Sequence, residues 1–294
     1  TFFNFDVLII LIKLMMTLWQ GLCHLPTSWH PAMGKFCGKV LFIFAGSRKK
    51  IAQVNLEACF PNLSKTEKEK ILRDNFLYLG RSLIETGIAW FWSNQKIQSQ
   101  INYEIINLDL LLPNESNKGN LIIFKHSQHL ELDARLLAMN APMYGVSRSH
   151  NSASMNKIQD KGRLSSLKDT ADKNNPRKFM KWLKNGKNVL YAIDQDYGWD
   201  HSVKLKFFQK EAATITTTKK IIDATDSNLL FINSYYVNNK LILKIELIDH
   251  LELDSTELAQ KINDIMEESI LQHPAEYLWI HRRFKSTLGK DFYK

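Results

Sequence analysis

The stretch that decides the fold runs from residue 119 to residue 135 and reads GNLIIFKHSQHLELDAR. Its unbroken apolar run, Leu121 to Phe124, is typical of a short strand buried on both faces of a sheet. A cluster of polar and charged residues follows directly, from Lys125 to Arg135. Sites in open α/β sheets lie beyond the carboxyl ends of the strands. We therefore expect the chemistry of this chain to centre on that cluster.

Strands and helices alternate through the rest of the chain. Residues 142–146 and 189–193 resemble the first strand, and helical patterns run over residues 176–184 and beyond residue 212. Residues 229–236 and 241–247 flank Asn238 and Asn239 and predict a hairpin, and an amphipathic helix is expected over residues 255–271. This order predicts an α/β fold with a central, mostly parallel sheet flanked by helices.

The first 118 residues have a mainly helical pattern. Ser64 and Glu67 form the signature of a capping box, and the helix behind it is expected to end near Trp92. We divide the chain into a membrane-anchor helix (residues 1–22), a helical membrane-proximal region (residues 23–118) and a catalytic α/β region (residues 119–294). Since no linker separates the last two, residues 23–294 are expected to form one continuous domain.

Residues 1–22 are the most hydrophobic part of the chain and predict a membrane anchor. Spanning a bilayer takes about 20 apolar residues, and this segment reaches that length only by including Lys13. A lysine at the bilayer centre costs about 2.5–3.5 kcal/mol unless its amine snorkels to the interface. A single span or a deeply embedded anchor is therefore expected, and a buried core helix is the alternative.

The charge balance narrows the choice of partners. Lys and Arg outnumber Asp and Glu by 39 to 30, which gives a net charge of +9 and a pI near 9.3. Such an excess suits nucleic acid, an anionic membrane or an acidic protein. The chain has no nucleic-acid recognition motif, so no nucleic-acid partner is expected. Its three cysteines, all within residues 23–59, lack the spacing of a zinc site or a disulfide framework.

His126 and Glu131 are the residue types that a hydroxyl-activating reaction needs. A hydroxyl has too high a pKa to attack a thioester unaided near neutral pH, and a neutral imidazole can accept its proton. A carboxylate behind the imidazole can fix its tautomer and stabilise the cation that forms. Because a loop is expected between the strand and the next helix, Glu131 could reach the ring of His126.

The same pattern leaves other interpretations open. A metal site could use the four neighbouring residues His126, His129, Glu131 and Asp133. The histidine-rich loop of metallohydrolases, however, has one residue rather than two between its first two histidines. A polar loop before a helix whose N-terminus favours acidic residues would also give this pattern. A membrane-surface protein without catalytic activity would explain the anchor and the charge.

Motifs along nearly the whole chain resemble one known family. His126-x4-Glu131 resembles the HX4(D/E) motif of the glycerolipid acyltransferase superfamily, and its surroundings are similar to those in bacterial lipid A secondary acyltransferases, the lauroyl and myristoyl transferases of lipopolysaccharide assembly. The matching segments, in order, are Asn55 to Pro61, Lys125 to Arg135, Gly162-Arg163, Tyr191 to Gly198, Ala212 to Thr214 and Tyr277 to Lys285. Two residues depart from the pattern: His129 within the motif, and Gln209 where glycine is expected.

The resemblance implies an enzyme that transfers a fatty acyl chain, lauroyl or myristoyl, from acyl carrier protein to a 3-hydroxyl of a lipid A acyl chain. No cofactor and no metal is implied. The implied location is the bacterial inner membrane, with the catalytic region anchored on the cytoplasmic side. Another glycolipid acceptor, such as mannosylated phosphatidylinositol, is the alternative.

The resemblance also implies roles for single residues. His126 is the general base, Glu131 is its orienting carboxylate, and Arg163 is the third catalytic residue, which binds phosphate or stabilises charge at the thioester carbonyl. The residues expected to bind substrate are Lys125, Asp194, Asp196, Arg282 and Arg283. The basic residues expected to face acyl carrier protein or the lipid A phosphates are Lys125, Arg163, Lys219, Lys220, Arg282, Arg283 and Lys285.

Overall fold

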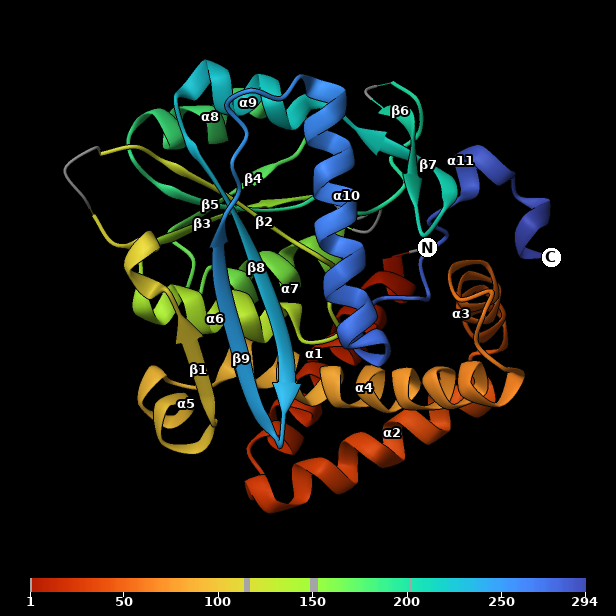
Figure 1. Ribbon diagram of the computed structural model, residues 1–294. Helices are drawn as coiled ribbons and strands as arrows, with labels where there is room; N and C mark the ends of the chain where they lie inside the picture. Colours follow the sequence, from red (N-terminus) through yellow and green to blue (C-terminus); the bar gives the residue numbers. More distant parts are fainter. Residues whose placement is uncertain (1, 114–116, 149–152, 201) are drawn as a thin grey trace.

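The computed structural model describes residues 2–113, 117–148, 153–200 and 202–294. Within these ranges, seven strands form one sheet in the order β1-β9-β8-β2-β5-β3-β4, with helices on both faces (Figure 1). Neighbouring strands run parallel except β8 and β9, which form an antiparallel hairpin. The sheet strands are β1 (Tyr103–Ile106), β2 (Asn120–Phe124), β3 (Met143–Ser147), β4 (Asp169–Asp172), β5 (Asn188–Ala192), β8 (Asn228–Val237) and β9 (Lys240–Leu247).

The helices divide between the N-terminal region and the two faces of the sheet (Figure 1). They are α1 (Phe2–Cys23), α2 (His30–Phe44), α3 (Gly46–Cys59), α4 (Lys65–Phe91), α5 (Asn94–Gln100), α6 (Leu130–Asn140), α7 (Ala153–Arg163), α8 (Pro176–Lys184), α9 (Thr217–Thr225), α10 (Ser255–Gln272) and α11 (Lys285–Leu288). A separate two-stranded ribbon consists of β6 (Ser202–Phe207) and β7 (Lys210–Ile215).

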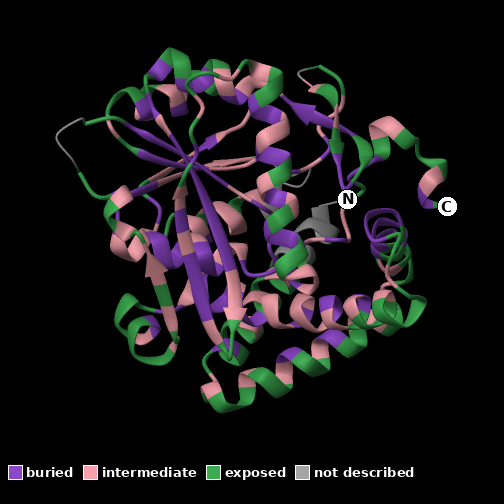
Figure 2. Cartoon of the chain, in the orientation of Figure 1, coloured by how far each residue is buried: buried purple, intermediate pink, exposed green. Residues whose placement is uncertain are grey.

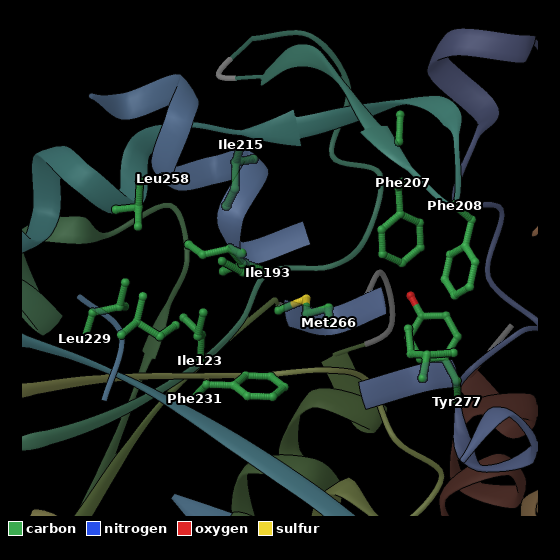
Figure 3. Close-up of a cluster of buried hydrophobic side chains, with 14 of the residues drawn as sticks. Ile123, Ile193, Phe207, Phe208, Ile215, Leu229, Phe231, Leu258, Met266 and Tyr277 are labelled. Carbon is green, nitrogen blue, oxygen red and sulfur yellow. The ribbon is translucent and has the colours of Figure 1, made fainter. Parts of the chain in front are cut away.

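Side chains of the sheet alternate between two hydrophobic cores, as the two-residue period of a strand requires. Ile123 and Phe231 face a core shared with α8, α9 and α10, part of which is drawn in Figure 3. Ile122 and Leu230 face the other core, shared with α4 and α6. Figure 2 shows buried residues gathered on the central strands and exposed residues on the outer faces of the helices. The predicted α/β fold with a mostly parallel sheet is confirmed.

Most elements predicted after residue 119 are confirmed to within two residues at each end. The hairpin turns at Asn238 and Asn239, whose φ angles of 48° and 63° lie in the left-handed region that Asn tolerates. The capping box is also confirmed. Ser64 Oγ accepts from the Glu67 backbone N–H at 3.3 Å, and Glu67 Oε2 accepts from the Ser64 backbone N–H at 2.8 Å.

The two edge strands, β1 and β4, were not predicted. β1 lies within residues 23–118, which were expected to be helical, so that expectation is corrected for residues 103–106. Each edge strand has only four residues and borders a single neighbour. Short edge strands with polar residues are a common protection against edge-to-edge pairing, and they carry little hydrophobic periodicity for a sequence to reveal.

The turn between β6 and β7 explains one departure from the family pattern. Phe208 and Gln209 form it with φ angles of 50° and 58°. Glycine is favoured in this left-handed region, whereas other L-residues pay about 1–2 kcal/mol there. The backbone conformation therefore explains why glycine is expected at position 209. Gln209 adopts the same left-handed conformation at a higher conformational cost.

The N-terminal segment forms the single helix α1, but it does not support the expected membrane span. In the described residues, no helix is both long enough and apolar enough to cross a membrane. Polar residues, Lys13 among them, interrupt the apolar sequence of α1. The helix instead packs on α4, where Trp19 Nε1 donates to the Leu83 carbonyl at 2.9 Å and Cys23 is fully buried.

Helices α2 and α4 approach each other so closely that glycine is required where they cross. A Cβ atom on Gly80 of α4 would lie 2.2 Å from both the carbonyl oxygen of Gly34 and the backbone nitrogen of Gly38. A Cβ atom on Gly38 would lie 2.5 Å from the Phe76 carbonyl oxygen. A side chain at this crossing would therefore push the two helices apart.

We expect Gly80→Ala to lower the free energy of unfolding by about 1–3 kcal/mol, because backbone atoms cannot move aside as a flexible side chain can. Denaturant unfolding in detergent measures the change. Gly46→Ala is the matched control, since nothing lies within 4 Å of its added Cβ atom. An unchanged unfolding midpoint for Gly80→Ala would contradict the close crossing.

Candidate active site

Two neighbouring strands bring the central pair of the site together. β2 and β5 run parallel with Phe124 opposite Ala192, and both strands end at this pair. His126 and Asp194 each lie two residues further on, so the strand register places them side by side. His126 Nδ1 hydrogen-bonds to Asp194 Oδ1, and the His126 backbone N–H donates to Asp194 Oδ2 at 2.9 Å. Asp194 therefore holds both the loop and the imidazole ring.

Asp194 is buried, whereas His126 is partly open to a cavity. The Asp194 side chain is 1% exposed and the His126 side chain is 22% exposed. Burial by itself raises the pKa of Asp194, but the charge and hydrogen bonds of His126 outweigh it and lower the pKa to about 2. Asp194 is thus ionised at neutral pH, and its carboxylate keeps a proton on the Nδ1 atom of His126. The Nε2 atom of His126 is left to accept a proton from a substrate.

Glu131 lies in the first turn of α6, as predicted, but its partner is Arg163. Its Oε1 accepts from Arg163 Nη2 at 2.6 Å and from Nε at 3.1 Å, and its Oε2 accepts from Trp90 Nε1 at 2.9 Å. Within the described residues, Glu131 makes no hydrogen bond to His126. The expected position of Glu131 behind the imidazole is therefore corrected, because Asp194 occupies that position.

Gly162 explains why a glycine precedes the arginine. A Cβ atom on Gly162 would lie 2.2 Å from Trp90 Cδ2, so the missing side chain lets α7 pack against the indole ring. This close packing brings Arg163, the next residue, to the carboxylate of Glu131. Gly162 and Arg163 thus work together. Gly162 allows the close approach of α7 to Trp90, and Arg163 makes the ion pair with Glu131.

A cavity of about 400 Å³ joins these groups, and His126, Glu131 and Arg163 all line it. Its inner part has small and aliphatic walls, because Gly145 and Leu190 lie opposite each other in the middle of β3 and β5. Its outer part is polar and includes Arg148 and Lys173, which lie beyond the strand ends, together with Gln195 and Tyr197. This shape suits an apolar chain whose reactive, polar end lies at the carboxyl edge of the sheet.

A group of charged side chains is buried beneath the loop that carries His126. His129 Nδ1 lies 2.9 Å from both carboxylate oxygens of Asp133, and His129 Nε2 lies 3.0 Å from Glu276 Oε2. Lys125 Nζ donates to Ser269 Oγ at 2.6 Å. Lys125 and His129 are each 1% exposed, so their partners in the protein replace water.

The two buried cations have opposite pKa shifts. Burial by itself lowers the pKa of His129, but Asp133 and Glu276 outweigh burial and raise it to about 9. For Lys125, burial dominates and lowers the pKa to about 8, although Asp133, Glu276 and Asp194 oppose it. His129 is therefore protonated at neutral pH, and both of its ring nitrogens donate to carboxylates.

A segment from much later in the chain holds the loop in place. The Leu278 backbone N–H donates to the His126 carbonyl at 2.9 Å, and the Gln128 backbone N–H donates to the Glu276 carbonyl at 2.8 Å. Ser127 and Tyr277 pair between these bonds as an isolated antiparallel bridge. Residues 126–128 and 276–278 thus form a short ladder, which fixes the backbone on which His126 is carried.

The four residues of the alternative metal site face different partners. His126 contacts Asp194, and Glu131 contacts Arg163, whereas His129 and Asp133 contact each other beneath the loop. In the part of the chain that the structure describes, no group of three or more His, Cys, Asp and Glu residues is placed to hold a metal ion. The geometry therefore gives the metal interpretation no support.

Residues 4–286 match the family of bacterial lipid A biosynthesis acyltransferases. The chain belongs to this family. It is therefore an acyltransferase. Two proteins of Escherichia coli (strain K12), a lipid A biosynthesis palmitoleoyltransferase and a lipid A biosynthesis lauroyltransferase, are each 34% identical to it over 86% of this chain and 84% of the relative.

More distant proteins extend the comparison. A lipid A biosynthesis myristoyltransferase of the same E. coli strain is 22% identical over 86% of this chain and 79% of the relative. Among solved structures, the 1-acyl-sn-glycerophosphate acyltransferase PlsC from Thermotoga maritima is 13% identical, with a TM-score of 0.39, and covers 84% of this chain and 96% of that chain.

The acyltransferase buries two residues that were expected to bind substrate. Lys125 points to protein acceptors beneath the loop, and Arg283, which is 3% exposed, donates from Nη1 to the Ala213 carbonyl at 2.8 Å. Neither residue lines the cavity. The substrate-binding prediction is corrected for both, because their charged groups are occupied by the protein interior. They are also excluded from the expected binding surface for acyl carrier protein or lipid phosphate.

The other residues expected to bind substrate have different positions. Asp194 contacts His126, as described above. Asp196 is buried and accepts from the Ser286 backbone N–H at 2.7 Å, so it fastens the loop after β5 to the C-terminal region. Arg282 is exposed, with its guanidinium 5.9 Å from the ring centre of Tyr293. The cavity lining includes neither Asp196 nor Arg282, and it also lacks Lys219, Lys220 and Lys285.

Four residues of the site were not assigned to it from sequence: Trp90, Arg148, Lys173 and Tyr197. Trp90 lies in the run Trp90-Phe91-Trp92 at the end of α4, and nothing in that run distinguishes one aromatic ring as part of a site. Arg148 and Lys173 directly follow β3 and β4, so their signal was the position after a strand. Because β4 was not predicted, that signal was missing for Lys173, whereas for Arg148 it was present after the predicted strand over residues 142–146 and was not used.

The buried histidine predicts a pH dependence of stability. His129 has a folded pKa of about 9 and an ordinary value of 6.5, so its contribution is fully present below pH 6.5 and is lost as the pH rises toward 9. We expect the free energy of unfolding to fall between pH 6.5 and 8 by at most about 1.4 kcal/mol per pH unit from this group. Above pH 8, Lys125 has the opposite effect. Its pKa is lowered from 10.5 to about 8, so its deprotonation raises the free energy of unfolding as the pH rises.

Denaturant unfolding at several pH values between 6.5 and 8 measures this slope. His129→Asn should lose it, and the exposed His24→Asn serves as the matched control and should keep it. Equal slopes for the wild-type protein and His129→Asn would contradict the assignment of the proton to His129.

Proposed function

We propose that this acyltransferase moves a fatty acyl chain, lauroyl or myristoyl, from acyl carrier protein to a 3-hydroxyl of a lipid A acyl chain. The observation that carries the proposal is His126, which is paired with the buried Asp194 and lines a cavity with an aliphatic inner part. The family and the names of the 34% identical relatives support lipid A as the acceptor. The geometry supports a general-base mechanism in which the acceptor supplies its own nucleophile.

The reaction needs one proton to be moved twice. The acceptor hydroxyl oxygen attacks the thioester carbonyl carbon while His126 Nε2 takes the hydroxyl proton. The imidazolium that forms is stabilised by Asp194, which already accepts the Nδ1 hydrogen bond. When the tetrahedral intermediate collapses, the carbon–sulfur bond breaks and the imidazolium returns the proton to the sulfur. The products are an ester on the acceptor and a free thiol on the carrier.

Arg163 is proposed to stabilise the negative charge that develops on the thioester oxygen. Its Nε and Nη2 atoms are held by Glu131, which leaves Nη1 to point to a substrate. Glu131 and Trp90 together fix the guanidinium plane, so it need not reorganise as the charge forms. In this assignment Glu131 acts through Arg163, and Asp194 acts through His126.

We expect His126→Ala and Asp194→Asn each to lower kcat by about 10²–10⁴-fold, because either change removes an oriented general base. The assay incubates the protein in detergent with acyl carrier protein bearing an acyl chain and with under-acylated lipid A, and the lipid is weighed by mass spectrometry. The double variant His126→Ala/Asp194→Asn should be little worse than either single variant, because the two residues act as one unit. Glu131→Gln should lower kcat further in the His126→Ala background, because it acts through Arg163.

The exposed Asp223→Asn is the matched control and should leave the rate unchanged. An absence of any mass gain with folded wild-type protein would overturn the lipid A proposal and direct the assay to other glycolipid acceptors. Full additivity between His126→Ala and Asp194→Asn would instead overturn the pairing of base and carboxylate.

We also propose that the protein acts at the cytoplasmic side of the bacterial inner membrane, held there by α1 and α2. Exposed apolar side chains support this proposal. They include Leu14 and Leu18 on α1 and Phe36, Ile43 and Phe44 on α2. An apolar face of this kind on a helix is suited to the boundary between lipid headgroups and acyl chains.

Flotation with vesicles of phosphatidylethanolamine and phosphatidylglycerol tests the membrane proposal. We expect Phe36→Ser/Phe44→Ser to reduce vesicle binding at least tenfold, because each buried aromatic side chain contributes about 1.5–3 kcal/mol. Leu247→Ser/Leu251→Ser removes two similarly exposed apolar residues elsewhere and should bind as the wild-type protein does. Equal losses in both double variants would contradict the assignment to α2.

A further inference from the structure

The positive charge of the chain is concentrated beside the cavity. Residues 148–187 contain eleven Lys and Arg residues against three Asp residues, a net charge of +8, whereas the whole chain carries +9. This segment comprises α7, β4 and α8 with their connections, and several of its residues line the polar part of the cavity. The rest of the chain is close to neutral. The basic excess is therefore a local feature of the region around the cavity.

A stripe of cations leads from the cavity along α8. Arg148 and Lys173 line the cavity just beyond the ends of β3 and β4. Arg177, Lys181 and Lys184 follow at the i, i+4, i+7 spacing that places side chains on one face of a helix, and all three are exposed. We call these five residues the basic stripe. Because Arg177 and Lys184 are seven residues apart, the α8 part of the stripe extends about 10 Å along the helix axis.

The α8 part of the stripe is not neutralised by the protein itself. Arg177, Lys181 and Lys184 form no salt bridge within the described residues, and α8 contains no Asp or Glu. The nearby carboxylate of Asp169 pairs instead with Lys178 at 2.9 Å. The opposite side of α8 is fixed in the core by Phe179. A rigid helix therefore presents three unpaired cations in a row.

We infer that the basic stripe is the docking surface for the acidic carrier protein that delivers the acyl thioester, an inference that rests on the proposed function. A negatively charged protein attracted to the stripe arrives with its thioester near Arg148 and Lys173, at the polar part of the cavity. Complementary charge of this kind raises the association rate and orients the partner more than it tightens the final complex. The stripe thus selects the donor by its carrier rather than by its acyl chain.

An anionic membrane is the competing occupant, and the distribution of apolar side chains favours the protein. Among residues 156–187, whose exposure the structure describes, Leu164 is the large hydrophobic residue that is exposed, at 48%. The exposed apolar residues proposed to enter lipid lie on α1 and α2 instead. A surface with many cations and little apolar area suits a soluble acidic partner, since it offers little to insert into acyl chains.

The test compares two donors that carry the same acyl chain, one on acyl carrier protein and one on pantetheine alone. The variant Arg177→Glu/Lys181→Glu/Lys184→Glu reverses three exposed charges outside the catalytic machinery. Lys50→Glu/Lys65→Glu/Lys70→Glu, on α3 and α4, is the control with the same change in net charge at exposed positions. We expect kcat/KM with the carrier-bound donor to fall at least tenfold in the stripe variant alone. With the pantetheine donor it should stay within twofold in all three proteins.

The outcomes separate the inference from the proposed function. Equal losses on both donors, or no loss on the carrier-bound donor, would overturn the docking surface while leaving the acyl transfer intact. The docking surface would also be overturned if the stripe variant lost binding to phosphatidylglycerol vesicles but kept its kcat/KM for the carrier-bound donor. That result would assign the stripe to membrane binding. Activity of the wild-type protein with pantetheine but not with the carrier would overturn both. A carrier-specific loss that added salt reproduces in the wild-type protein would support the inference.

Discussion

Two positive charges buried beneath the loop of His126 set the conditions for the rest of the site. Lys125 and His129 are each 1% exposed, and charges at that depth are stable only when the protein replaces the water around them. Asp133 of α6 and Glu276, at the end of a short 3₁₀ helix (Pro274–Glu276), hold His129 from its two ring nitrogens. Satisfying these charges joins the end of β2, the start of α6 and a segment near residue 276 into one unit. The position of His126 follows from that unit.

The two carboxylates of the site have different partners: Asp194 contacts His126, and Glu131 contacts Arg163. The sequence indicated that these residues belong to the site but did not predict which of them contact each other. The strand before His126 and the helix containing Glu131 were readable from local patterns, because burial and helical periodicity leave local signals. The pairing of His126 with Asp194 depends on the register of β2 against β5, whose residues are far apart in the chain. No local pattern encodes that register. Asp194 was therefore recognised as a site residue without its partner.

The fold could be predicted where elements are long or buried, and not where they are short or at an edge. The central strands are apolar runs, and α10 and α4 begin with capping boxes, so each carries its own signal. β1 and β4 carry four residues each and take their conformation from a neighbouring strand. The burial of Arg283 and Lys125 could not be predicted either. The presence of a Lys or Arg in the sequence does not reveal whether its charged group contacts solvent or a carbonyl group of the protein.

The short ladder between residues 126–128 and 276–278 orders events during synthesis of the protein. Gln128 and Tyr277, which form one of its contacts, are separated by 149 residues. A chain still growing on the ribosome already contains His126 but lacks the segment that holds its loop, and it lacks Glu276, which balances the charge of His129. The nascent chain therefore carries an unassembled site until residues 276–278 have left the ribosome.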